Sequence, residues 1–252
     1  MEMYLLCVAA LCAGFINGTV GGGGLVQTPA LLILLHQMPV AAIMGTAKFS
    51  SVIGSIMSAV QFSKHVTFRW QVLAAMVASA FVFSSIGARL ISYLDPSVVK
   101  PLIWLLLIVV FVYMLVKKDF GITTKKEIKS SKSIVYSFLF GAIIGLYDGF
   151  LGPGTGSFLI LFFVSVIGFD FLNASAHAKI VNISTNIAAF IYFVWTNNVL
   201  WEFALPMAVC NLIGAYIGSK AAILRGNKFV RALFLGIIGL MIVRYGYDIF
   251  LK

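Results

Sequence analysis

The stretch NGTVGGGG at residues 17–24 interrupts an apolar segment near the beginning of the chain. Four consecutive glycines destabilise a helix, because glycine loses more conformational freedom on folding than any other residue. A helix that breaks within hydrocarbon leaves backbone N–H and C=O groups unpaired, and each such group costs several kcal/mol there. The amides of this stretch must therefore face protein, water or a ligand.

The composition of the chain is that of a membrane protein. Its 252 residues are 61% hydrophobic and 10% charged, with a mean hydropathy of +1.04, values outside the range of soluble domains. Apolar runs of about 20 residues, enough to cross ~30 Å of hydrocarbon, occur at residues 41–63, 70–94, 98–116, 134–151, 172–195, 201–224 and 229–251. Such runs favour helices over the short alternating strands of a membrane barrel, and we predict an all-α polytopic membrane protein.

Several function classes are disfavoured by the sequence. The net charge of +10 arises from basic residues that lie mostly at predicted helix ends and in one loop, which is typical of topology determinants and argues against a nucleic-acid partner. The three cysteines form no CxxC pair, so we expect no metal site and no cofactor. Since HExxH and GxSxG motifs are also absent, an enzyme is not expected.

The chain contains an internal repeat at an offset of 131 residues. Lys48 falls on Lys179 and Trp70 on Trp201 at this offset, and both residue types are scarce within membrane segments. We therefore predict two homologous transmembrane repeats, residues 1–116 and 133–252, joined by a basic linker at residues 117–132. The glycines that match are Gly14, Gly18, Gly21 and Gly23 with Gly145, Gly149, Gly152 and Gly154.

The repeats are predicted to be inverted relative to each other. Each contains a helix, a Gly-rich break, a short helix (residues 25–36 or 158–168) and three longer helices, giving 8 to 10 membrane segments. Whether the short segments cross the bilayer or re-enter, each repeat crosses an odd number of times. With the linker in the cytoplasm, the basic loops at 64–69 and 220–228 also lie inside and both termini lie outside, although Arg89 and Lys100 do not fit this scheme.

Two broken helices at equivalent positions indicate the binding site of a transporter. A Gly-rich turn before a helix directs free N–H groups and the positive end of the helix dipole at one point, which suits an anion. The earlier glycines of each half have small-xxx-small spacing and are better explained by helix packing. The predicted substrate-binding residues are Asn17, Gly21, Gly22, Gly23, Gly24, Gln27, Thr46, Lys48, Ser51, Gly152, Gly154, Thr155, Gly156, Ser157, His177, Lys179, Asn182 and Asn186.

Polar residues form one stripe on the helix after each short segment. Spacings of three, four or seven residues place them on one helix face. A lysine within an apolar run faces the bundle interior by default, and two such lysines attract an anion; snorkelling to the bilayer surface is the alternative. The stripes consist of Lys48, Ser51 and Ser55, and of Ser175, Lys179, Asn182 and Asn186.

Two titratable residues are candidates for proton coupling. Asp148 lies deep in a predicted helix and is either a proton site or a salt-bridge partner for Lys48 or Lys179. His177 could contact substrate or carry a proton, or be a buried, hydrogen-bonded histidine.

The sequence resembles the sulfite exporter TauE/SafE family, also called the 4-toluene sulfonate uptake permease family. The resemblance rests on GFINGTVGGGGLVQTPALL at residues 14–32 and GLYDGFLGPGTGSFLILFF at residues 145–163, and it covers nearly the whole chain. The family motifs fall on the glycines of the two turns, although Pro153 and Thr155 interrupt the second glycine run. The resemblance implies a secondary transporter of the cytoplasmic membrane for sulfite, sulfonates or sulfoacetate.

We therefore expect a small anion to bind between the two breaks near the bilayer midplane and to be moved by alternating access. An anion channel and a transporter of another small organic anion, such as a short carboxylate, are the alternatives.

Overall fold

The computed structural model describes residues 2–35, 37–91, 104–105, 108, 111–112 and 130–250, and within these ranges it contains helices and no strand. The order of its elements along the chain is α1 (Glu2–Val20), α2 (Gly24–Leu34), α3 (Val40–Ser63), α4 (Trp70–Leu90), α6 (Ser130–Phe150), α7 (Thr155–Phe162), the π-helix η1 (Phe163–Ile167), α8 (Phe171–Trp195) and α9 (Trp201–Phe250).

The prediction of an all-α polytopic membrane protein is confirmed. Within the described ranges, six helices are long and apolar enough to cross a membrane, judged by length and composition: α1, α3, α4, α6, α8 and α9. Two shorter apolar helices, Gly24–Leu34 and Thr155–Ile167, follow the Gly-rich breaks. The order of helix, break, short helix and long helices is therefore the same in both halves.

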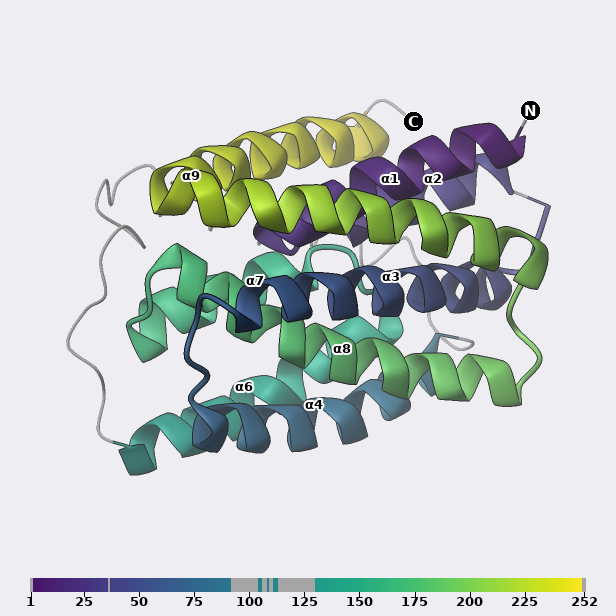
Figure 1. Ribbon diagram of the computed structural model, residues 1–252. Coiled ribbons are helices and arrows are strands. Elements are labelled where there is room, and N and C mark those ends of the chain that lie inside the picture. Colours follow the sequence, from purple (N-terminus) through teal and green to yellow (C-terminus); the bar gives the residue numbers. More distant parts are fainter. Residues whose placement is uncertain are drawn as a thin grey trace.

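Some predicted boundaries differ from the structure or lie outside its described part. Most of the predicted span at 98–116 and of the linker at 117–132 is outside the described residues, and α6 begins at Ser130, within that linker. The predicted boundary followed the apolar run, whereas helical hydrogen bonding continues beyond it. The predicted spans at 201–224 and 229–251 lie in α9, which leaves helical geometry at Gly226 (φ 71°, ψ −169°) and turns back on itself there (Figure 1).

In each half, a glycine with left-handed backbone ends the first helix. Gly21 follows α1 with φ 78°, and Gly152 follows α6 with φ 84°. This conformation strains residues that carry a Cβ but not glycine. The N–H of Gly21 donates to the carbonyl of Asn17 (3.0 Å) and that of Gly152 to the carbonyl of Tyr147 (3.3 Å), so each helix closes with a hydrogen bond before its break.

The helices that precede the breaks are packed through glycine. Helix α1 packs against α9, and α6 packs against α4 (Figure 1). A Cβ added to Gly18 would lie 2.5 Å from the carbonyl oxygen of Ala215, and one added to Gly149 would lie 2.0 Å from that of Ser84. Ser84 and Ala215 are themselves related by the 131-residue offset. The same close helix contact is thus made twice, which is the packing role predicted for the earlier glycines.

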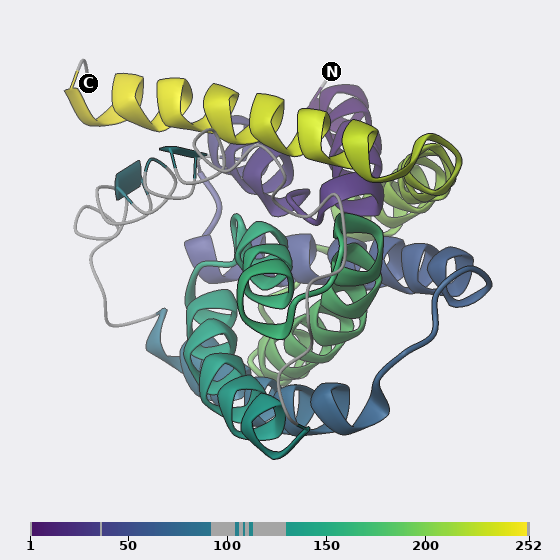
Figure 2. The same cartoon turned by 90° about the vertical axis from the view of Figure 1, so that its left-hand side faces the viewer.

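Helices α3 and α8 lie side by side and antiparallel at the centre of the bundle (Figures 1 and 2). Thr46, near the start of α3, accepts a hydrogen bond at Oγ1 from the backbone N–H of Leu200, just beyond α8 (2.9 Å). His177, near the start of α8, accepts one at Nε2 from the backbone N–H of Arg69, beyond α3 (3.1 Å). The two pairs are related by the repeat offset, so equivalent helices run past each other in opposite directions.

Apolar side chains hold the second short helix in the interior. Leu159, Phe163 and Ile167 of α7 and η1 are fully buried. The ring of Phe162 stacks on that of Phe140 from α6, with centroids 4.3 Å apart. Lipid is as apolar as these side chains, so close contact, and not transfer from water, stabilises this packing. The second break is thereby fixed between α6 and α8.

Candidate functional site

A cavity of about 40 Å³ lies where the two helix breaks meet. One water needs ~10–15 Å³ in the same measure, so the cavity has room for a ligand of a few heavy atoms. Segments from both halves of the chain contribute to its wall. The lining residues are Asn17, Gly21, Gly24, Thr28, Met44, Ala47, Lys48, Ser51, Ser55, Asp148, Leu151, Gly152, Thr155, Gly156, Asn182 and Asn186.

Many of the residues singled out in the sequence meet at this cavity. Polar stripe residues of α3 and α8 face the ends of the two breaks, although they are far apart in the sequence. Met44, Ala47 and Leu151 also line the cavity and were not predicted, because apolar side chains give no polar signal; the repeat of Ala47 as Ala178 was the one available hint. The predicted site residues that line it are Asn17, Gly21, Gly24, Lys48, Ser51, Asp148, Gly152, Thr155, Gly156, Asn182 and Asn186.

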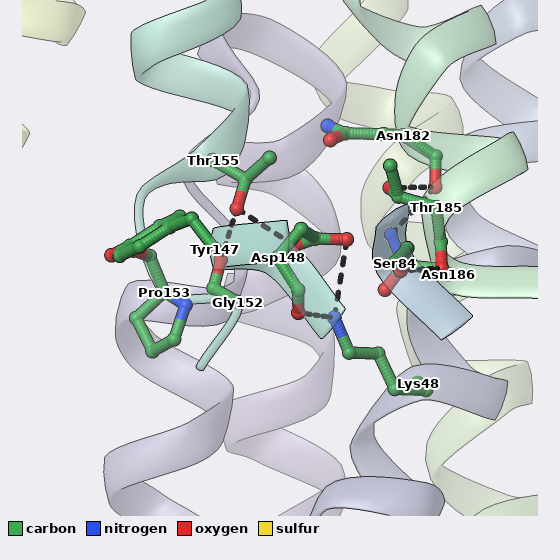
Figure 3. Close-up of polar contacts among 10 residues, drawn as sticks. All are labelled: Lys48, Ser84, Tyr147, Asp148, Gly152, Pro153, Thr155, Asn182, Thr185 and Asn186. Atoms are coloured by element: carbon green, nitrogen blue, oxygen red, sulfur yellow. Dashed lines mark hydrogen bonds and ion pairs between the residues drawn. The ribbon is translucent and has the colours of Figure 1, made fainter. Parts of the chain in front are cut away.

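Lys48 and Asp148 form a buried ion pair that connects the two halves of the chain. The Nζ of Lys48, on α3, lies 3.2 Å from Oδ2 of Asp148, on α6, and the two side chains are 6% and 2% exposed. The same ammonium group donates a hydrogen bond to the backbone carbonyl of Asp148. This is one of the two ion pairs considered for Asp148 from the sequence. Figure 3 shows the lysine reaching the carboxylate.

The carboxylate of Asp148 also holds the second break in shape. The hydroxyl of Thr155, the first residue of α7, donates to Oδ1 of Asp148 (2.7 Å) and lies within hydrogen-bonding distance of the Gly152 carbonyl (2.8 Å). The hydroxyl of Tyr147 donates to the carbonyl of Pro153 on the other side of the turn (Figure 3). Thr155 and Pro153, which interrupt the glycine run, thus supply the contacts that order it.

Lys179 occupies the equivalent position in the second half but has a different partner. Its side chain is fully buried and its ammonium donates to the backbone carbonyl of Asn17, as that of Lys48 does to the carbonyl of Asp148. The side chain of Asn17 donates through Nδ2 to Oγ of Ser55 (3.0 Å). Lys179 does not line the cavity, but it contacts the backbone of a residue that does. The first half therefore has an amide where the second has a carboxylate.

Hydrogen-bonding groups without a protein partner remain at the cavity. Asn182 is 5% exposed and its Oδ1 has no partner among the described residues. Since the O and N of an amide are assigned from context, this side chain offers either a donor or an acceptor. Figure 3 shows its amide directed from α8 toward Thr155. The backbone N–H groups of Gly24 and Gly156, at the starts of α2 and α7, donate to no carbonyl in the described part.

The two breaks touch each other directly. A Cβ added to Gly156 would lie 1.7 Å from the carbonyl oxygen of Gly21, and one added to Gly21 would lie 2.9 Å from Cα of Gly156. Real Cβ atoms do not approach backbone this closely. Glycine at both positions is therefore required for the breaks to meet, and their contact forms one wall of the cavity.

Other predicted site residues lie outside the cavity and contact protein groups. Gln27 donates to the carbonyl of Ala47 (3.4 Å) and accepts from Nδ2 of Asn211 (2.9 Å). Thr46 and His177 receive the backbone N–H groups that follow α8 and α3. Because Nε2 of His177 accepts a hydrogen bond, the ring is neutral and donates from Nδ1 to its own helix. These three side chains connect helices.

The remaining residues of the turns also lie outside the cavity. Gly23 is in a packed position, since an added Cβ would lie 2.5 Å from the Ala13 carbonyl oxygen, whereas a Cβ at Gly22 would meet nothing closer than 3.4 Å. Gly154 has φ 86° and forms the turn before α7. Ser157 is buried, and its Oγ has no hydrogen-bond partner in the described part of the chain. Among the described residues, no cluster of three His, Cys, Asp or Glu side chains is arranged to hold a metal ion.

Comparison with known proteins confirms the resemblance drawn from the motifs. A family model described as "Sulfite exporter TauE/SafE" matches residues 6–245. The chain is 34% identical over 233 residues to the probable membrane transporter protein ORF9 of a Sinorhizobium species, covering 92% of this chain and 87% of that protein. It is 31% identical over 244 residues to the probable membrane transporter protein YfcA of Escherichia coli strain K12 (97% and 89%) and 30% identical over 244 residues to one of Haemophilus influenzae (97% and 94%). No solved structure matches it.

Proposed function

This chain belongs to the sulfite exporter TauE/SafE family, and on that premise we propose that it is a secondary transporter of a small sulfur-containing oxyanion in the cytoplasmic membrane. It is a multi-pass membrane protein whose relatives are named probable membrane transporters. The observation that carries the proposal is the cavity at the meeting point of the two helix breaks, with a buried lysine in its wall. Sulfite, a sulfonate and sulfoacetate are the substrates considered.

The cavity groups can hold an oxyanion from several sides. The ammonium of Lys48 supplies a positive charge, and the amides of Gly24 and Gly156 supply N–H donors at the positive ends of α2 and α7. The side chain of Asn182 adds a donor when its amide is turned. The carboxylate of Asp148 lies beside the ammonium of Lys48, and in this proposal the bound anion takes the place of that carboxylate.

Alternating access follows from the relation between the halves. We propose that the halves are inverted in the membrane, with the linker at 117–132 in the cytoplasm and both termini outside. The antiparallel packing of α3 and α8 supports this arrangement, since two equivalent membrane helices that run in opposite directions belong to inverted repeats. Rocking of one half against the other would open the cavity to each side in turn.

Proton coupling in this proposal involves Asp148 alone. Its carboxylate faces Lys48 of α3 and the hydroxyl of Thr155 of α7, and Lys179 of α8 is the other buried charge of the site. A proton on this carboxylate would neutralise the partner of Lys48, so the proton and the substrate anion would act on the same ammonium group. We leave His177 out of the coupling, because its Nε2 is occupied by a backbone N–H and its ring lies outside the cavity.

Flux into proteoliposomes tests the function. Purified protein is first screened by thermal shift against sulfite, thiosulfate, sulfonates, sulfate and short carboxylates, and uptake of the stabilising anion is then measured with radiolabel. We expect a sulfur oxyanion to be taken up and its uptake to be stimulated by unlabelled anion on the opposite side. Single-channel conductance without such exchange would instead identify a pore, and stabilisation by a carboxylate alone would change the substrate class.

A matched lysine pair tests the site. Lys48→Ala should reduce uptake by at least about tenfold, as expected for the loss of a charge-assisted contact. Lys64→Ala is the control, because Lys64 is exposed beyond the end of α3 and outside the cavity. Equal uptake by the two variants would refute the binding role of Lys48.

A further inference from the structure

Three side chains that carry a formal charge are buried in the described part of the chain: Lys48, Asp148 and Lys179. All three belong to the cavity wall or contact a residue of it. His177 is buried as well, but it is neutral, because Nε2 accepts a hydrogen bond from a backbone N–H. Two ammonium groups and one carboxylate give this buried region a formal charge of +1.

The positive charges of the two lysines are not equally neutralised by carboxylates. Lys48 lies 3.2 Å from the carboxylate of Asp148, whereas the only hydrogen bond of Lys179 among the described residues is to the carbonyl of Asn17. Positions 17 and 148 are equivalent in the repeat, so a single difference, Asn against Asp, accounts for the inequality. An ammonium buried without a carboxylate is strongly destabilised in an apolar environment. An anion in the adjacent cavity would supply the negative charge that Lys179 lacks.

We infer that Asp148 determines the charge of the anion that the cavity accepts: with Asp148 ionised, the site is balanced by one negative charge and prefers a singly charged oxyanion, such as a sulfonate, to a doubly charged one. This inference rests on the proposed function and narrows its substrate class. With a neutral Asp148 the two lysines alone give the site a charge of +2, and only then does a doubly charged anion balance it.

The electrostatic effect is large enough to select between anions. At an effective dielectric constant of about 20, a unit charge ~10 Å away changes the affinity for a second unit charge by more than about tenfold. The effect on a doubly charged anion is correspondingly greater. Removal of the Asp148 charge should therefore favour both anions and favour the doubly charged one more.

Methanesulfonate and sulfate are suitable probes, because both are sulfur oxyanions with five heavy atoms and they differ by one unit of charge. The measurement is the ratio of their initial uptake rates, each radiolabelled, into proteoliposomes at neutral pH. In the wild-type protein methanesulfonate should be taken up faster. Asp148→Asn should shift the ratio toward sulfate by at least about tenfold, while the uptake of at least one anion persists.

The repeat offers a matched set of variants. Asn17→Asp gives Lys179 a carboxylate and leaves the site without net charge, so uptake of both anions should fall and sulfate uptake should fall further. The double variant Asn17→Asp with Asp148→Asn moves the carboxylate to the other half and should restore the wild-type ratio. Asp170→Asn is the control: it removes a carboxylate at the start of α8, outside the cavity, and asparagine caps a helix equally well.

The outcomes separate this inference from the proposed function. A ratio in Asp148→Asn within about twofold of the wild-type value, or a double variant that behaves like Asp148→Asn, would overturn the inference while uptake by the wild type stands. If a variant transports neither anion, the affinities of the purified variant for methanesulfonate and sulfate are measured by thermal shift. The ratio of the two affinities then replaces the ratio of uptake rates. A wild-type protein that neither takes up nor is stabilised by either anion, or by any anion of the initial screen, would overturn the proposed function and the inference together.

Discussion

Gly156→Ala perturbs the contact between the two breaks at its closest point. The added Cβ would lie 1.7 Å from the carbonyl oxygen of Gly21, and ordinary contact begins at 3.4 Å, so the two backbones must separate by about the difference, ~1.7 Å. Backbone atoms on both sides cannot move aside as a flexible side chain can. Overpacking in proteins costs about 1–3 kcal/mol, and we expect a cost at or above the upper end.

The expected result is a loss of transport that exceeds the loss of stability. A separation of ~1.7 Å widens one wall of a cavity of about 40 Å³, so uptake should fall by at least about tenfold, as for other misplacements of this size. Uptake is measured in proteoliposomes, and stability by thermal unfolding in detergent with the protein amount matched by size-exclusion chromatography.

Gly22→Ala is the control for this experiment. It lies in the same glycine run, but its added Cβ would meet nothing closer than 3.4 Å, and its backbone is not in the left-handed region. Uptake and melting temperature should stay close to the wild-type values. Normal transport by Gly156→Ala, or equal damage from Gly22→Ala, would refute the view that contact between the breaks shapes the site.

Two further predictions concern the charge of Lys179 and the topology. Lys179→Met should leave the protein folded, because methionine has a similar length and removes an ammonium that is buried without a carboxylate. Uptake should fall at least about tenfold, and normal uptake would leave Lys179 a purely structural contact of Asn17. In a cysteine-free background, Lys64→Cys should react with an impermeant thiol reagent from the cytoplasm and Asn198→Cys from outside, and labelling of both from one side would exclude inversion.

Much of the fold was predictable because a bilayer restricts backbone so strongly. Apolar runs long enough to cross hydrocarbon identified the long helices, and the glycines at 21–24 and 152–156 identified where the helices break, since both breaks coincide with left-handed glycines in the structure. The predicted spans at 201–224 and 229–251 correspond to the two arms of α9, which turns at Gly226, within the predicted basic loop at 220–228. The sequence did not predict that helical geometry continues directly on both sides of that glycine.

Helical geometry explains why Thr46 and His177 lie outside the cavity. Successive residues of an α-helix are turned by about 100°, so residues two apart lie on nearly opposite faces. His177 and Lys179 therefore could not both point at one ligand, and neither could Thr46 and Lys48. Residues three or four apart, such as Asn182 and Asn186, share a face and do line the cavity. The spacing alone could have separated the residues that face the cavity from those that do not, but all of them were selected because they are polar.

The repeat explains why the site has the charges that it has. Two identical halves would place the same residue at positions 17 and 148, and the buried charge would then be +2 with two asparagines or zero with two aspartates. A site with two uncompensated lysines would hold an anion tightly, and release is as necessary to transport as capture. A carboxylate that returns to Lys48 competes with the anion for the same ammonium and so favours release. In the proposed transporter, the difference between Asn17 and Asp148 would therefore give the cavity both an attraction for an anion and a means of displacing it.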